Sequence, residues 1–390
     1  MGLYALAVFT AALVALIWGY LLLARGGFWQ VRRWLVPTAP STEATGPIAG
    51  VIPARNEEGV VAETIVSLLH QRHVPSLHLF LVDDASNDRT TEKAEDAARQ
   101  ADGLASLTIL HSNSLPIGWT GKLWAVQQGI EKARDLLPEF FLLTDADIVH
   151  SPTSVASLVS VAQSGGYDLV SFMPKLQCRT LVEKILSPAF VFFFFKLYPP
   201  AWIADPDNAV AGAAGGCMLI RSTALQRAGG VTSIHDQIID DCALARAIKR
   251  SGGKLWLGLS PDTVSLRSYR SFSEIGRTIS RTAFSQLRHS SVMLLATLLG
   301  MATTYLVPVA LMLSGRSLLV TLGAAAWAMM TVAYLPMIRF YGLRAPWAAL
   351  LPLAALFYTG ATVHSALKYW VGRGGEWKGR VQDRVGLRTE

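Results

Sequence analysis

The stretch Phe140-Phe141-Leu142-Leu143-Thr144-Asp145-Ala146-Asp147 decides how the rest of the chain is interpreted. Its first five residues form a short run of apolar and β-branched side chains, which is typical of a buried strand. Two aspartates follow, and ligands of α/β proteins bind where such strands end. Asp145 and Asp147 either lie on one side of an extended segment or straddle a turn, and both arrangements let them share one divalent cation, Mg²⁺ or Mn²⁺. A lone Asp-x-Asp is more often a pair of solvated loop residues, so the surrounding sequence must decide.

Short apolar runs alternate with amphipathic segments before this stretch. The pattern predicts strands at 48–52, 77–82 and 107–110, and helices at about 57–70, 88–101 and 122–134. Repeated strand–helix units form a mostly parallel sheet covered by helices, so the predicted fold class is α/β. A glycine-rich turn into another buried strand is predicted at 210–221. That turn either lets a substrate approach the backbone closely or has a structural role.

Polar residues follow the early strands. Pro53-Ala54-Arg55-Asn56-Glu57 comes after the first strand and Asp83-Asp84 after the second, and a carboxylate there can bind ribose hydroxyls. Neither Gly-x-Gly-x-x-Gly nor Gly-Lys-Ser/Thr occurs, which excludes a Rossmann dinucleotide motif and a P-loop. Lys122 ends the loop Pro116-Ile117-Gly118-Trp119-Thr120-Gly121-Lys122 and either meets a phosphate or is an exposed lysine at a helix start.

The apolar residues of the chain gather in long segments. The chain has 390 residues, of which 51% are hydrophobic, and its mean hydropathy is +0.35. Residues 2–24 carry no charge and are predicted to be a retained transmembrane anchor (1–24), since the apolar run is too long for a signal peptide. Residues 25–46 are predicted to be a linker, with a Pro- and Ser-rich part at 37–47. Apolar stretches at about 291–313, 318–338 and 345–367 predict a C-terminal membrane region (291–367), followed by a basic tail (368–390).

The charge pattern gives conflicting topologies. Arg25, Arg32 and Arg33 place the following domain in the cytoplasm, and four crossings then put the tail outside. The tail is nevertheless rich in Lys and Arg, which favours a cytoplasmic tail. Pro308 lies inside one stretch and Pro346 and Pro352 lie near the start of the last. We therefore predict a cytoplasmic tail, with one stretch re-entrant or interfacial.

The net charge, the cysteines and one apolar segment indicate which partners and ligands to expect. The net charge is +7, but the basic residues lie beside apolar spans, so anionic lipid is expected rather than nucleic acid. Three cysteines without Cys-x-x-Cys spacing offer no zinc site, and no obligate protein partner is evident. The segment 187–204, with four consecutive phenylalanines, is predicted to be interfacial, dipping into the leaflet; the alternative is a buried core helix.

Five motifs in order resemble those of the family 2 glycosyltransferases with the GT-A fold. They cover about residues 47–290 and are Pro53 to Glu57, Asp83-Asp84, Gly121-Lys122, Asp145-Ala146-Asp147 and Ile239-Asp240-Asp241. Pro-x-Gly-Trp-x-Gly-Lys, together with the apolar spans, looks most like the hopanoid-biosynthesis-associated branch and the related carotenoid-type enzymes. The resemblance implies a GT-A nucleotide-sugar-binding domain at 47–290, flanked by N-terminal and C-terminal transmembrane helices.

The resemblance also implies roles for individual residues. The nucleotide pocket would be lined by Pro53, Arg55, Glu57, Asp83 and Asp84. Lys122 would lie near the diphosphate, Asp145 and Asp147 would hold the metal, and Asp241 would be the general base. Asp240 stands where the family has Glu, which leaves its role open.

Processive family members carry Gln-x-x-Arg-Trp after the base, but here the Trp is absent and Gln286 is displaced, which argues against polymer synthesis.

Four further residues have alternative interpretations. Arg277 and Arg281 either contact the diphosphate or face lipid headgroups. His150 and His235 flank acidic residues, but such a histidine is more often a surface or capping residue than a metal ligand.

These observations predict a multi-pass enzyme of the cell (inner) membrane with a cytoplasmic catalytic domain. It would transfer one sugar, with inversion, from a nucleotide-sugar, expected to be UDP-linked, to a lipid hydroxyl such as that of a hopanoid or another isoprenoid lipid, with Mg²⁺ or Mn²⁺ as cofactor. The alternatives are a polyprenyl-phosphate sugar transferase, whose acceptor needs no general base, and a nucleotidylyltransferase. A non-enzyme would leave the clustered carboxylates without a purpose.

Overall fold

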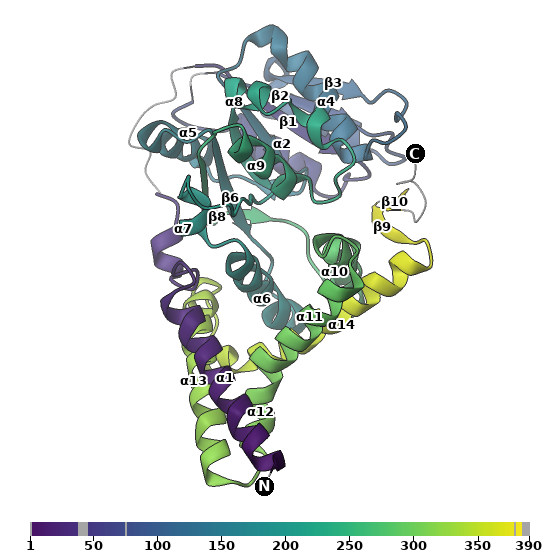
Figure 1. Cartoon of the computed structure of the whole chain (residues 1–390). Helices are drawn as coiled ribbons and strands as arrows, with labels where there is room; N and C mark the ends of the chain where they lie inside the picture. Colours follow the sequence, from purple (N-terminus) through teal and green to yellow (C-terminus); the bar gives the residue numbers. More distant parts are fainter. Residues whose placement is uncertain (1, 38–45, 75, 378–379, 384–390) are drawn as a thin grey trace. The chain divides into compact units, whose positions relative to one another are not determined.

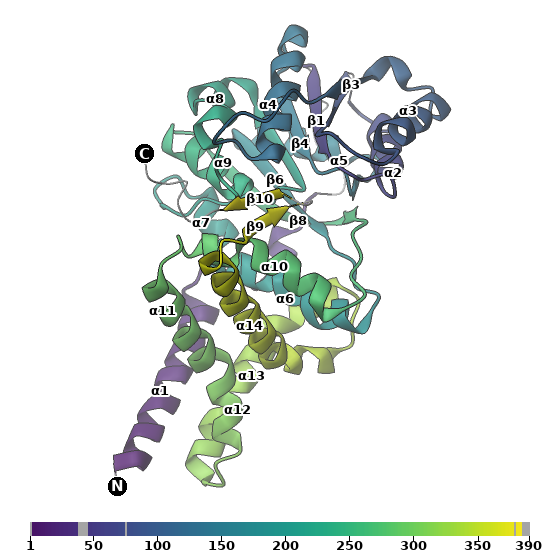
Figure 2. The same cartoon turned by 90° about the vertical axis from the view of Figure 1, so that its right-hand side faces the viewer.

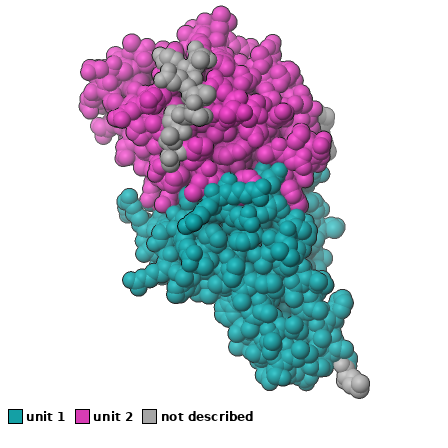
Figure 3. All heavy atoms as spheres, turned by 90° about the vertical axis from the view of Figure 1, so that its left-hand side faces the viewer, with its two compact units in different colours: residues 1–33, 178–201, 268–390 teal, residues 34–177, 202–267 magenta. Residues whose placement is uncertain are grey.

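The computed structural model describes residues 2–37, 46–74, 76–377 and 380–383, and the chain divides into two compact units (Figure 3). Unit 1 contains residues 1–33, 178–201 and 268–390, and unit 2 contains residues 34–177 and 202–267. The contacts therefore group residues 178–201 and 268–290, which the sequence analysis assigned to the catalytic domain, with the apolar helices. Most of the predicted linker part 37–47 lies outside the described residues.

Unit 2 is built on a sheet whose first half is parallel (Figure 1). The strands β1 (Ile48–Ala54), β2 (Leu77–Asp83), β3 (Leu107–His111) and β4 (Phe140–Thr144) lie in the order β3-β2-β1-β4, and each neighbouring pair is parallel. The helices α2 (Val61–Leu69), α3 (Thr90–Gln100) and α4 (Gly121–Ala133) connect them. The predicted strand–helix alternation is confirmed, with bounds that differ by at most four residues.

The second half of the sheet contains an antiparallel strand. β7 (Cys217–Arg221) lies between β4 and β6 (Leu169–Lys175) and is antiparallel to both, whereas β8 (Leu255–Ser265) is parallel to β6. The short β5 (Ile148–Val149) pairs antiparallel with the end of β8. The helices in this half are α5 (Ser154–Gly165), α7 (Pro200–Ala204), α8 (Ser222–Arg227) and α9 (Asp240–Arg250). Four of the seven pairings are parallel, so the sheet is mostly parallel, as predicted.

The core of unit 2 explains why its central strands carry continuous apolar runs. Every residue of β1 and of β4 is buried, because helices cover both faces of a parallel sheet. Ile52, Leu81 and Leu142 pack with residues of α2 and α5 in one apolar cluster. The charged residues that follow β4 are thereby delivered to the edge of a rigid sheet.

Unit 1 is helical apart from one hairpin (Figure 2). Its elements are α1 (Gly2–Leu23), α6 (Leu181–Leu197), α10 (Phe272–Gln286), α11 (Ser291–Met301), α12 (Val307–Met312), α13 (Ser317–Phe340), α14 (Leu351–Trp370), β9 (Gly374–Trp377) and β10 (Arg380–Asp383). α1 runs beside α12 and α13 in both views. Four helical stretches are long and apolar enough to cross a membrane: 4–23, 291–312, 317–340 and 345–370.

Proline residues alter two of these stretches without ending them. Pro308 has no N–H to donate to the carbonyl of Thr304, and a π-helical segment, Ala302–Leu306, precedes it and joins α11 to α12. Pro346 and Pro352 lie in the first turns of the 3₁₀ helix Ala345–Leu350 and of α14, where a missing N–H costs nothing. Both stretches remain helical over a length that could cross.

The phenylalanine-rich segment is a helix packed within unit 1. Phe192 is 1% exposed and its ring lies 5.2 Å from that of Phe28 and 5.1 Å from that of Tyr334. Phe193 contacts the rings of Tyr305 and Tyr358. The buried-helix alternative accounts for these residues, while the interfacial position of 187–204 stays a prediction.

Candidate active site

The two aspartates that follow β4 straddle a turn, which settles one alternative left open by the sequence. Asp145 to Asp147 connect β4 to β5. The Thr144 hydroxyl donates to the Gly216 carbonyl (2.8 Å), and the Thr64 hydroxyl donates to the Ala146 carbonyl (2.8 Å). These hydrogen bonds fix both ends of the turn to neighbouring elements.

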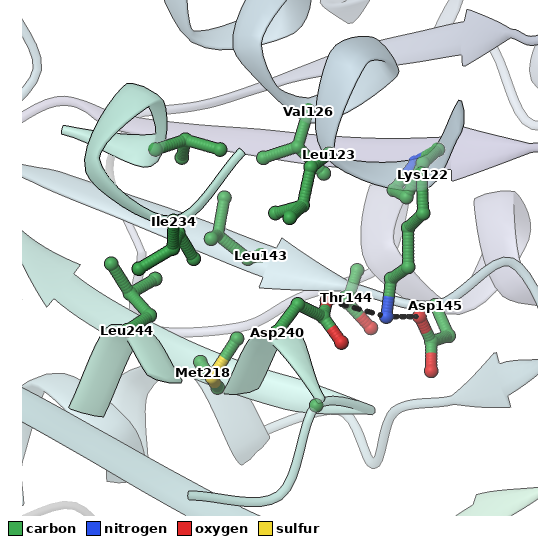
Figure 4. A pocket seen from close by; sticks show the side chains of 13 residues that line it. Lys122, Leu123, Val126, Leu143, Thr144, Asp145, Met218, Ile234, Asp240 and Leu244 are labelled. Atoms are coloured by element: carbon green, nitrogen blue, oxygen red, sulfur yellow. Dashed lines mark ion pairs between the residues drawn. The ribbon is translucent and has the colours of Figure 1, made fainter. Parts of the chain in front are cut away.

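Lys122 connects two of the predicted site carboxylates (Figure 4). Thr120 caps α4 by accepting from the Leu123 N–H, which places Lys122 in the first turn. The Lys122 Nζ lies 2.9 Å from Asp145 Oδ1 and 3.0 Å from Asp240 Oδ2, so these two oxygens are at most 5.9 Å apart. Burial alone would lower the pKa of Lys122, but the Asp145 and Asp240 carboxylates hold it above its usual range.

Asp240 and Asp241 occupy the first turn of α9, where the helix dipole favours negative charge. Asp241 Oδ2 accepts from the Gly215 N–H (2.9 Å), and Asp241 Oδ1 accepts from the Cys242 N–H (2.7 Å). A Cβ on Gly215 would lie 3.2 Å from Asp241 Oδ2, so the glycine permits this close approach. Burial and the charge of Asp240 raise the pKa of Asp241 to about 6, against the opposing effect of Lys122.

The second aspartate of the turn has a different cation as its partner. Arg267 Nε lies 3.1 Å from Asp147 Oδ2, and Arg267 Nη2 lies 3.2 Å from Glu57 Oε1. The Ser265 hydroxyl also donates to Asp147 Oδ2 (3.2 Å). Arg267 lies two positions after the end of β8 and belongs to none of the five motifs, so no pattern in the sequence marks it.

The residues predicted to line the nucleotide pocket lie at the ends of β1 and β2. Pro53 lies in β1, and Arg55 Nη1 is 3.6 Å from Asp84 Oδ2. Asp83 accepts from the Ser86 N–H and lies 3.6 Å from His111 Nδ1. The Nε of Arg55 is buried and has no hydrogen-bond partner among the described residues. Such an orphan donor has an unmet need for an acceptor, which an oxygen of a bound nucleotide would meet.

Two histidines and two arginines were also considered as site residues. His150 is buried between the hydroxyls of Thr144 (2.9 Å) and Ser154 (3.2 Å), and burial lowers its pKa to about 3, so it is a neutral structural residue. His235 is half-buried and packs against Trp119. Arg277 and Arg281 belong to α10 in unit 1, and their proposed contact with a diphosphate stays a prediction.

The charges of the site fit a cation that arrives with a phosphate ligand. Among the described residues no group of three His, Cys, Asp or Glu side chains could hold a metal by itself. Mg²⁺, however, is commonly bound by one or two carboxylates plus substrate phosphates. At this edge five carboxylates share three cationic side chains: Asp84 pairs with Arg55, Asp145 and Asp240 pair with Lys122, and Glu57 and Asp147 pair with Arg267. This negative excess would repel a bare diphosphate. The binding of a divalent cation by Asp145 and Asp147 stays a prediction.

Comparisons with known proteins indicate which family the chain resembles. Residues 51–229, a little under half of the chain, match the family described as Glycosyl transferase family 2. An N-acetylglucosaminyltransferase of Rhizobium leguminosarum bv. viciae is 30% identical over 134 residues, which cover 33% of this chain and 29% of that protein. An undecaprenyl-phosphate 4-deoxy-4-formamido-L-arabinose transferase of Pectobacterium atrosepticum is 29% identical over 143 residues, which cover 36% of this chain and 40% of that protein. The chain thus spans less than half the length of either curated relative.

A solved structure has a similar fold over most of the chain. The mannosyltransferase of Pyrobaculum calidifontis, solved in complex with GDP-Man and Mn²⁺, superposes with a TM-score of 0.52 and 17% identity. The superposition covers 89% of this chain and 99% of that one. At this identity the similarity concerns the fold alone.

Proposed function

We propose that this chain is a family 2 glycosyltransferase with the GT-A fold, which transfers one sugar from a UDP-sugar to a hydroxyl of a membrane lipid, with inversion. The match of residues 51–229 to that family and the similar fold of the mannosyltransferase support the proposal. The observation that carries the proposal is the meeting of Asp145, Lys122, Asp240 and Asp241 at one edge of the sheet. These residues come from three separate elements, as expected of a site rather than of a solvated loop. We further propose that the lipid is an isoprenoid such as a hopanoid, because the motif around Trp119 resembles that branch.

The chain's own residues account for the proton transfer. Asp241 takes the proton of the acceptor hydroxyl while the acceptor oxygen bonds to the anomeric carbon and the sugar–phosphate bond breaks. The bonding electrons leave with UDP. Asp241 suits this role because its pKa of about 6 leaves it mostly ionised near neutral pH, yet more basic than an ordinary aspartate. Its hydrogen bonds to the backbone at Gly215 and Cys242 fix its orientation.

Donor binding involves the ends of three strands. Arg55, Glu57, Asp83 and Asp84 would hold the nucleoside, next to Pro53 in β1. Lys122 would donate to the diphosphate, for which its ammonium is already held at the edge of the sheet. A divalent cation, Mg²⁺ or Mn²⁺, when bound at Asp145 and Asp147, would neutralise charge on the leaving diphosphate.

One comparison favours a second candidate acceptor. The Pectobacterium relative is by its name an undecaprenyl-phosphate sugar transferase, so its acceptor is a phosphate. A phosphate acceptor is already ionised and needs no general base. The half-buried and oriented Asp241 therefore favours a hydroxyl acceptor, and the dependence of turnover on Asp241 distinguishes the two.

The test is UDP release by the full chain in detergent or vesicles, from several UDP-sugars. Each reaction is run with and without Mn²⁺ or Mg²⁺, and with membrane lipid extract or with polyprenyl phosphate as acceptor. We expect release that needs both the cation and the lipid extract. If no nucleotide-sugar is bound or turned over, the enzyme proposal fails. Mass spectra of membrane lipids from cells with and without the gene would identify the sugar and the acceptor.

We also propose that the chain is a multi-pass protein of the inner membrane with unit 2 in the cytoplasm. The support is the position of Arg25, Arg32 and Arg33 directly after α1. The basic residues of the tail favour a cytoplasmic C-terminus, which is incompatible with four full crossings. A reporter fused after Glu390 that is active only outside the membrane would refute the cytoplasmic tail and establish four crossings.

A further inference from the structure

Arg267 joins two acidic residues that the chain delivers on separate loops. Glu57 follows β1, Asp147 follows β4, and Arg267 follows β8, so its guanidinium connects three strand ends of unit 2. Both acidic side chains are mostly buried, with 15% of Glu57 and 10% of Asp147 exposed. The Arg267 side chain is 43% exposed. An ion pair at such a site is screened less than one between two exposed side chains.

The contacts of Asp147 use only one of its carboxylate oxygens. Arg267 Nε and the Ser265 hydroxyl both donate to Oδ2, whereas no described residue bonds to Oδ1. The Leu266 N–H also donates to the Asp147 carbonyl (2.8 Å), which fixes the backbone of the turn against the end of β8. The carboxylate is therefore oriented through one oxygen, and the other oxygen keeps its capacity to bind a ligand.

We propose that Arg267 is a positioning residue, which holds Asp147 for the divalent cation and Glu57 for the nucleotide. This inference rests on the proposed function and assigns a role to a residue that none of the five motifs contains. Ligating carboxylates are commonly held by such outer hydrogen bonds, and their loss costs about 10- to 100-fold in metal affinity or activity. Arg267 would thus couple the metal side of the site to the nucleotide side.

The geometry requires an arginine rather than any cation. Nε and Nη2 of one planar guanidinium reach two different carboxylates at 3.1 Å and 3.2 Å. A lysine ammonium is a point charge on a flexible stem and cannot reproduce that fixed fork. Arg267→Lys should therefore retain one of the two interactions and lose the geometry of the other.

The test measures binding without turnover. Mn²⁺ titrations followed by electron paramagnetic resonance, with and without UDP, are run on the full-length natural protein and on Arg267→Gln, Arg267→Lys and Arg270→Gln. Arg270 is the matched control, because it is exposed, lies three residues further on and forms no ion pair among the described residues; its backbone N–H donates to Glu274. We expect Arg267→Gln to weaken Mn²⁺ binding in the presence of UDP about 10- to 100-fold. The Mn²⁺ affinity of Arg267→Lys should lie between those of Arg267→Gln and the natural protein. The affinity of Arg270→Gln should equal that of the natural protein.

Separate outcomes would overturn separate claims. Equal Mn²⁺ and UDP affinities for the natural protein and Arg267→Gln would overturn the positioning role, whatever happens to turnover. Equal losses in Arg267→Gln and Arg270→Gln would also overturn it, because a general charge effect would then suffice. If the natural protein bound neither Mn²⁺ nor UDP, the proposed function itself would fail. Melting temperatures within about 2 °C of the natural protein would show that each variant is folded.

Discussion

The pH dependence of turnover is the most direct test of Asp241 as the general base. With a pKa of about 6, the carboxylate is about 90% ionised at pH 7 and about 10% ionised at pH 5. Only the ionised form can accept the proton of the acceptor hydroxyl. Turnover should therefore fall about tenfold from pH 7 to pH 5, whereas a base with the ordinary aspartate pKa would still be about 90% ionised at pH 5.

Two substitutions separate this explanation from simple acid denaturation. Asp241→Asn should lower turnover about 10²- to 10⁴-fold at pH 7 and leave a residual rate that is flat between pH 5 and pH 7. Asp240→Asn removes the neighbouring negative charge that raises the pKa of Asp241, so the acid limb of its profile should move to lower pH. The assay is UDP release at saturating donor and lipid, with circular dichroism at each pH to confirm folding.

An acid limb that stays in place in Asp240→Asn would refute the assignment of Asp241 as the general base. That assignment would equally be refuted by an Asp241→Asn protein that retains the turnover of the natural enzyme. A loss of UDP affinity in Asp241→Asn would show that this carboxylate binds the donor instead, because the proposed base makes no contact with UDP. The phosphate-acceptor alternative predicts little effect of Asp241→Asn on turnover.

Three further predictions follow from the packing. Asp147→Asn should weaken Mn²⁺ and UDP binding together, which calorimetry can compare with the unchanged binding expected of Asp241→Asn. Gly215→Ala should lower turnover with little change in UDP affinity, because the new methyl group would lie 3.2 Å from Asp241 Oδ2; an unchanged rate would show that Asp241 tolerates displacement. Phe192→Ala should lower the free energy of unfolding by about 3–5 kcal/mol. Phe190→Ala should lower it far less, because Phe190 is 39% exposed. Thermal unfolding in detergent measures both, and similar losses would contradict the buried-helix assignment.

The sequence predicted the first half of the sheet well because its signals are local. Buried parallel strands carry continuous apolar runs, and the strand at 140–144 was placed with the bounds that the structure shows. The glycine-rich turn into a strand at 210–221 was also predicted. Its antiparallel position between β4 and β6 was not, because strand pairing depends on contacts between residues far apart in the chain.

In the candidate site too, the sequence predicted which residues take part but not how they contact one another. Asp145, Asp240 and Lys122 were each identified from motifs, and the structure brings them together. That Lys122 bridges the two aspartates could not be foreseen, since the motifs fix positions along the chain and not the directions of side chains. Arg267 was missed altogether, because a single arginine after a strand carries no sequence pattern that marks it.

The order in which the chain visits its two units limits how the enzyme can be shortened. Unit 2 is made of residues 34–177 and 202–267, so α6 is an excursion between β6 and β7 that belongs to unit 1. A fragment cut at residue 267 would lose Tyr334, and a start at residue 34 would remove Phe28, and both of these rings pack against Phe192. Such a fragment would present a phenylalanine-rich helix to water and aggregate. A water-soluble version of unit 2 therefore needs the excursion replaced by a short polar loop, and deleting the long apolar helices alone will not produce one.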